Sequence, residues 1–121
     1  MSASYESVYK AALARWGPEL QHDKLIEEAA ELIKAVSKLK FLTPYPWICL
    51  EPGTDGYRAL EALTDEMADV EIMIEQVAYL YDLRERIEQR KREKIARVCR
   101  WLMEAVLKEQ PQGKEVEDEQ V

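Results

Sequence analysis

Two pairs of carboxylates constrain this chain most, because each pair is embedded in an apolar helical pattern. Glu28 and Glu31 lie three residues apart, and so do Glu66 and Asp69. Residues three apart share one face of a helix, so the two side chains of each pair project together. The fold must therefore place two acidic pairs on two helices without leaving them buried and unpaired.

The apolar residues around the two pairs recur at helical spacing and define two stripes. The first stripe, with Glu28 at its edge, consists of Leu25, Ala29, Leu32, Val36 and Leu39. The second, with Glu66 inside it and Asp69 on its border, consists of Leu63, Met67, Val70, Ile74, Val77 and Tyr81. A carboxylate that faces a core without a partner carries a large desolvation penalty. Four such carboxylates indicate a shared cation.

The residue types favour a hard metal ion. His22 is the only histidine, so the ligands would all be oxygens, which suits Mg²⁺, with Mn²⁺ as a substitute, better than Zn²⁺. A di-iron carboxylate bundle is excluded because it needs Glu-x-x-His pairs. The alternative is that these are solvated side chains in a chain with 34% charged residues. A single Glu-x-x-Glu is common, but two pairs on successive core-facing stripes favour the metal site.

Length and composition predict one domain over residues 1–108, which the helical spacing of its apolar residues makes all-α. An acidic, disordered tail over 109–121 follows it. The formal net charge of −7 argues against electrostatic binding to nucleic acid or to anionic membranes. Cys49 and Cys99 make no disulfide framework, and no apolar run has the length of a signal core or a membrane span. We therefore expect a cytoplasmic protein.

Four helices are predicted. The first covers residues 5–15 and ends at Trp16-Gly17-Pro18, and the second covers about 18–40. The third begins between residues 55 and 58 and ends near Tyr81. The fourth begins at about Leu83, with Asp82 as N-cap in a capping box with Glu85.

Residues 41–57 have no helical period and are rich in Pro and Gly, which predicts a long loop between the two acidic helices. Tyr45 and Trp47 in this loop could stack on a nucleobase or close over the site. Equally, they could cover an exposed helix face or a subunit boundary.

The pattern Glu27-Glu28-x-x-Glu31 followed by Glu66-x-x-Asp69 resembles the signature of the MazG-like, all-α nucleoside triphosphate pyrophosphohydrolases. The resemblance extends over residues 5–102 in helix order, although the loop between the acidic pairs is longer than is usual in that family. It implies a four-helix bundle assembled across a dimer or a dimer of dimers. It also implies Mg²⁺-dependent cleavage of an NTP or dNTP to the monophosphate and pyrophosphate. The sequence does not choose the base or the sugar.

The resemblance also implies roles for individual residues. Glu28, Glu31, Glu66 and Asp69 would hold the metal, Glu27 would be the general base, and Lys94 and Arg97 would bind phosphates. Gln21, on the carboxylate face of its helix, is either a substrate contact or an ordinary polar residue of an early turn, and Trp47 is a candidate substrate contact. His22 lies about 100° from the carboxylate row, which favours a surface or capping role.

Two alternatives remain open. The stripe of Arg90, Lys94 and Arg97 could be a solvated face that pairs with nearby glutamates. The whole chain could also be a non-catalytic helical module whose acidic rows pair with that stripe on a partner subunit. The third helix is apolar beyond one face, which predicts a homodimer or homotetramer.

Overall fold

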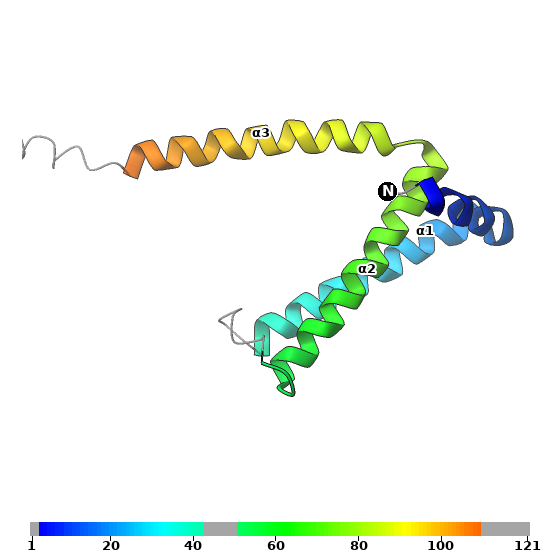
Figure 1. The fold of residues 1–121 in the computed structure, drawn as a ribbon, viewed down its shortest axis with the longest axis horizontal. Coiled ribbons are helices and arrows are strands. Elements are labelled where there is room, and N and C mark those ends of the chain that lie inside the picture. The colour runs from blue at the N-terminus through cyan, green and yellow to red at the C-terminus, as the bar shows by residue number, and fades with distance from the viewer. Residues whose placement is uncertain (1–2, 43–50, 110–121) are drawn as a thin grey trace, which may run out of the picture. The chain divides into compact units, whose positions relative to one another are not determined.

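The computed structural model describes residues 3–42 and 51–109, which form three α-helices and no strand. The helices are α1 (Ala3–Leu42), α2 (Asp55–Tyr81) and α3 (Arg84–Glu109) (Figure 1). The all-α prediction is confirmed; α1 ends two residues inside the predicted loop, and α2 begins at Asp55, within the predicted range. None of the helices in these two ranges is long and apolar enough to cross a membrane.

The predicted break between the first two helices lies inside α1. Gly17 has φ 83° and ψ 165°, which is not a helical conformation. A side chain at this position would be strained, whereas glycine adopts it readily. Pro18 follows at the first position of the next helical stretch, where its missing N–H costs nothing. α1 is thus two helical segments joined at a bend.

After the bend, α1 runs antiparallel to α2 and lies along it (Figure 1). The buried side chains of α2 are Ala59, Leu63, Val70, Gln76 and Ala78. The prediction that the second stripe is buried is therefore only partly right. Met67, Ile74 and Tyr81 are 49%, 44% and 55% exposed. The helix is rotated so that position 66, not position 67, continues the row made by residues 59, 63 and 70.

Both ends of α2 are fixed by local hydrogen bonds. The Thr54 hydroxyl accepts a hydrogen bond from the Tyr57 N–H at 3.1 Å, which satisfies one of the free donors of the first turn. At the other end, Asp82 adopts a left-handed conformation and the Leu83 N–H donates to the Ala78 carbonyl at 2.8 Å. Asp82 therefore caps the C-terminus of α2, and its predicted role as N-cap of the next helix was wrong.

The chain divides into two compact units, the first ending at Arg84 and the second beginning at Glu85. The second unit contains α3, in which no residue is buried. Its apolar side chains recur along one side at Ile87, Ile95, Val98, Leu102 and Val106, and Met103 and Leu107 lie on another. α3 is thus an amphipathic helix whose apolar residues are exposed from Ile95 onward.

Candidate metal centre

Three carboxylates from two helices converge in the first unit. Glu28 comes from α1, and Glu66 and Asp69 come from α2. One oxygen of each carboxylate lies within 4.8 Å of the other two. The antiparallel packing of α1 against α2 creates this cluster, because it sets the acidic turn of one helix beside that of the other.

Glu66 is partly buried in this cluster. Its Oε2 atom is buried and has no hydrogen-bond partner among the described residues. Burial raises the pKa of Glu66 above its ordinary value, and the negative charges of Glu28, Asp69 and Glu31 and a side-chain hydrogen bond with Glu28 raise it further. The site therefore favours an added positive charge, which either a proton or a cation could supply.

The donor set suits a hard divalent ion. Mg²⁺ binds oxygens at 2.0–2.1 Å, so two ligands on opposite sides of the ion lie about 4.2 Å apart. The carboxylate oxygens of Glu28, Glu66 and Asp69 are within 4.8 Å of one another, and small side-chain rotations would bring them into this range. Mg²⁺ usually keeps several waters, so three carboxylates are enough protein ligands. The residues present fit the ion that the sequence predicts.

Lys24 flanks the cluster on α1 and was not predicted. Its ammonium donates to Glu27 at 3.3 Å and lies 4.0 Å from Glu28. These pairs are three and four residues apart on one helix, a spacing at which ion pairs commonly form and which could have revealed them in the sequence. Because Lys24 and Glu27 are both well exposed, the pair adds little stability.

The other predicted site residues are placed differently. Glu31 is exposed and outside the group of three, although its charge acts on Glu66. Gln21 is 4% exposed and lies about two turns before Glu28 on α1. Lys94 and Arg97 are exposed on α3, in the second unit. Tyr45 and Trp47 lie outside the described residues.

Two links between the helices were not predicted from the sequence. The His22 ring lies 2.6 Å from the Pro18 carbonyl through Nδ1 and 2.6 Å from the Tyr81 hydroxyl through Nε2. A carbonyl only accepts, so Nδ1 donates to the Pro18 carbonyl, and Nε2 shares the second hydrogen bond with the Tyr81 hydroxyl. His22 therefore caps the turn that follows the bend and ties it to the end of α2.

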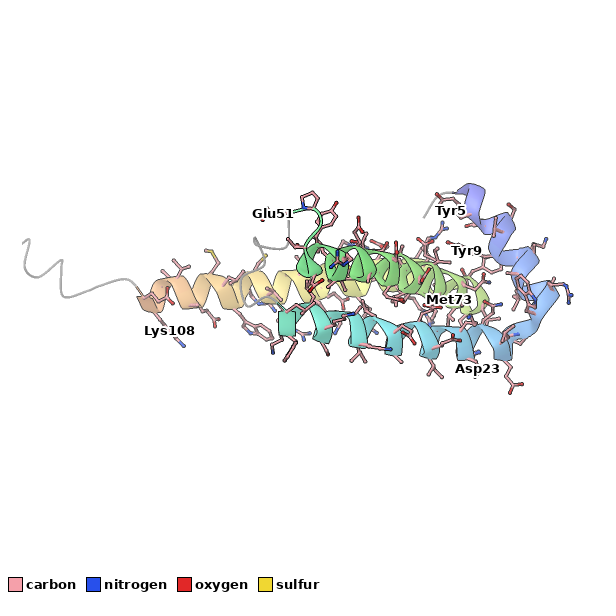
Figure 2. The ribbon with its side chains drawn as sticks, turned by 90° about the horizontal axis from the view of Figure 1, so that it is seen from below. Tyr5, Tyr9, Asp23, Glu51, Met73 and Lys108 are labelled. Carbon is pink, nitrogen blue, oxygen red and sulfur yellow. The ribbon has the colours of Figure 1, made fainter. Side chains whose placement is uncertain are left out.

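The second link fixes the segment of α1 that precedes Gly17. Tyr9, labelled on this segment in Figure 2, is 4% exposed, and its hydroxyl donates to Glu75 of α2. Gln76 donates from Nε2 to the Tyr9 carbonyl at 2.8 Å. Arg84 also lies 2.9 Å from Glu6. These contacts join residues more than 60 positions apart, so no local spacing in the sequence predicts them.

Comparisons of the chain with protein-family models, with curated proteins and with solved structures gave no match.

Proposed function

We propose that this chain is a Mg²⁺-dependent nucleoside triphosphate pyrophosphohydrolase of the MazG-like, all-α kind. It would cleave an NTP or dNTP between the α- and β-phosphates and release the monophosphate and pyrophosphate. The observation that carries the proposal is the cluster of Glu28, Glu66 and Asp69, with the unpartnered Glu66 Oε2 at its buried side. The double acidic motif of the sequence is what links this cluster to that reaction.

The residues of the cluster would act mainly through charge. When bound, Mg²⁺ supplies charge neutralisation for the phosphates and lowers the pKa of a coordinated water. Glu28, Glu66 and Asp69 would hold it, and Glu31 would add negative charge at the rim. The attacking water gives its proton to a base as its oxygen bonds to phosphorus, and the bond to the bridging oxygen breaks. Glu27, which pairs with Lys24 and directly precedes Glu28, is the proposed base.

Binding of the nucleotide is assigned to groups outside the cluster. Lys94 and Arg97 lie three residues apart on α3, so their cationic groups can address one chain of phosphates. Gln21, buried on the face of α1 that carries Glu28, is the proposed polar contact to substrate. Trp47 is proposed to contact the base.

The proposed enzyme is a homodimer or homotetramer that completes a four-helix bundle across subunits. Support comes from the apolar residues of α2 that its own chain leaves half exposed, among them Met67, Ile74 and Tyr81. Covering them with a second copy would remove this apolar surface from water. Sedimentation equilibrium at micromolar concentration tests this, because a stable species of 14.1 kDa would show that no such partner is needed.

A panel of NTPs and dNTPs, assayed for pyrophosphate release with and without Mg²⁺, tests the reaction. We expect Mg²⁺-dependent release that Glu66→Gln abolishes and that Glu61→Gln leaves intact. Glu61 is the matched control, because it is an exposed glutamate of the same helix outside the cluster. If Mg²⁺ raises the melting temperature but no nucleotide is cleaved, the metal site stands and the reaction is wrong. If Mg²⁺ changes neither the melting temperature nor the release of pyrophosphate, the chain is a non-catalytic helical module.

A further inference from the structure

A groove lies in the first unit between the segment of α1 before Gly17 and α2. It encloses about 500 Å³ and is mostly apolar. Its lining residues are Tyr5, Val8 and Tyr9 from α1 and Ala68, Glu71, Ile72 and Glu75 from α2. At 100° per residue, these α2 positions lie on the side of the helix opposite Glu66. The groove is therefore separate from the carboxylate cluster.

The groove combines exposed apolar side chains with negative charge. Tyr5, Val8 and Ile72 are 54%, 60% and 50% exposed. Glu71 is exposed, and Glu75 accepts the hydroxyl hydrogen of Tyr9. Burial, together with the bond to Glu75 and its charge, raises the pKa of Tyr9 to about 12, so the phenol stays neutral and adds no further charge. A suitable occupant is an apolar surface flanked by cations.

The chain itself contains such a surface. Residues 3–83 hold 15 acidic and 7 basic side chains, whereas α3 holds 9 basic and 5 acidic ones. On α3, Arg100, Met103 and Leu107 follow one another at steps of three and four residues and so share a face. Met103 and Leu107 are 66% and 61% exposed. By the same spacing Lys94 lies on the opposite side of α3, and Arg97, three residues before Arg100, lies at the edge of this face.

We propose that the groove receives α3 of a second copy of this chain, with Met103 and Leu107 against its apolar walls and Arg100 beside Glu71. Methionine suits such a surface because its flexible thioether fills irregular apolar gaps. The arrangement is reciprocal, since each copy offers one groove and one helix. The inference goes beyond the proposed reaction and does not depend on it.

Helix length excludes the same chain as donor of this face. The groove residues of α2 lie about ten positions before its end, or about 15 Å along the axis. Met103 and Leu107 lie about twenty positions into α3, or about 30 Å from its start. If α3 folded back along its own α2, the residues level with Ile72 would be near Arg92 and Lys94, a highly polar stretch. Met103 and Leu107 would pass beyond the groove.

The test is a charge exchange in the full-length protein, followed by sedimentation equilibrium. Glu71→Arg and Arg100→Glu each place like charges at both proposed contacts of a homodimer. We expect each variant alone to show a dissociation constant at least tenfold above that of the wild type. In an equimolar mixture, every contact of the mixed dimer again joins opposite charges, so the mixture should regain the wild-type mass.

Two further variants test the apolar walls. Ile72→Arg should weaken association as strongly as Glu71→Arg, whereas Ile33→Arg, an exposed isoleucine of α1 outside the groove, should not. All four positions are exposed, so helix content by circular dichroism should be unchanged. The proposal is overturned if the wild type is a monomer, if the charge variants keep its mass, or if mixing them restores nothing. The last result would also point to an occupant other than a second copy.

Discussion

Replacing Tyr9 with Phe should destabilise the contact that holds the first segment of α1 against α2. Tyr9 is 4% exposed and its hydroxyl donates to the Glu75 carboxylate. The hydrogen bond from Gln76 to the Tyr9 carbonyl involves only the backbone of residue 9 and should persist. A hydrogen bond to a charged group contributes about 1.5–3 kcal/mol. We therefore expect Tyr9→Phe to lower the free energy of unfolding by about that amount at pH 8.

The same contact predicts how stability changes at alkaline pH. The pKa of Tyr9 is about 12 in the folded chain, chiefly because the phenol is buried and then because it bonds to Glu75, against an ordinary value of 10. Above pH 10 the unfolded chain loses this proton while the folded chain keeps it. The stabilisation is thus complete below pH 10 and is lost as the pH rises to about 12, and its full size is about 2–3 kcal/mol. Phe has no proton to lose.

Urea unfolding followed by circular dichroism at 222 nm, from pH 8 to pH 11.5, checks both expectations. The wild type should be the more stable protein at pH 8, and its advantage over Tyr9→Phe should shrink above pH 10. Lysine deprotonation affects both proteins alike, so the difference between them isolates Tyr9. Tyr5→Phe is the matched control, because Tyr5 lies on the same segment but is 54% exposed. A difference that does not change with pH would refute the reasoning.

Three further predictions follow from the sites. Without metal, Glu66→Gln should melt higher than the wild type, by a margin that grows as the pH rises from the ordinary pKa of a glutamate to the raised pKa of Glu66. Mg²⁺ should raise the melting temperature of the wild type and of the control Glu61→Gln, but not that of Glu66→Gln. Arg97→Ala should weaken binding of a nucleoside triphosphate far more than binding of the nucleoside, as measured by calorimetry. Equal losses of affinity for the two ligands would show that Arg97 does not bind the phosphates. Gly17→Ala should lower the free energy of unfolding in urea by about 1–3 kcal/mol, because alanine is strained in the left-handed backbone conformation of this position. Steric contact adds nothing, since no neighbour lies within 4 Å of an added Cβ. An unchanged unfolding midpoint would contradict this prediction.

The helices could be predicted from the sequence because their signals are local. Periodic apolar residues predicted each helix, and Gly17 followed by Pro18 predicted the bend within α1. The end of α2 could not be resolved in the same way. Asp82 is a common residue both at an N-cap and in a left-handed C-terminal turn, and the spacing to Glu85 suggested the first. The hydrogen bonds of the chain select the second.

The carboxylate cluster could be predicted in part. Spacing within one helix placed Glu66 and Asp69 together, and two acidic pairs on apolar stripes predicted that the helices would share a site. Which residue of the first pair approaches the second helix depends on the rotation of α1 about its axis, and spacing alone does not determine this. The structure brings Glu28 into the group, whereas Glu31 lies at its rim. Contacts such as Tyr9 with Glu75 depend on the bend at Gly17 and leave no local pattern.

The placement of Glu66 is an argument for a ligand, because the helix pair would pack better without that charge. Position 66 continues the row of residues 59, 63 and 70, where an apolar side chain would be stabilising. Instead the chain has a carboxylate there, with a buried, unpartnered oxygen and other negative charges close by. A ligand that binds only the folded state offsets such a penalty, by about 2.7 kcal/mol at a concentration one hundred times its dissociation constant. Local rules of packing are most often broken where a site must be maintained. A solvated acidic face would need no such exception, since its carboxylates would lie in water, as Glu61 and Asp65 do on the same helix.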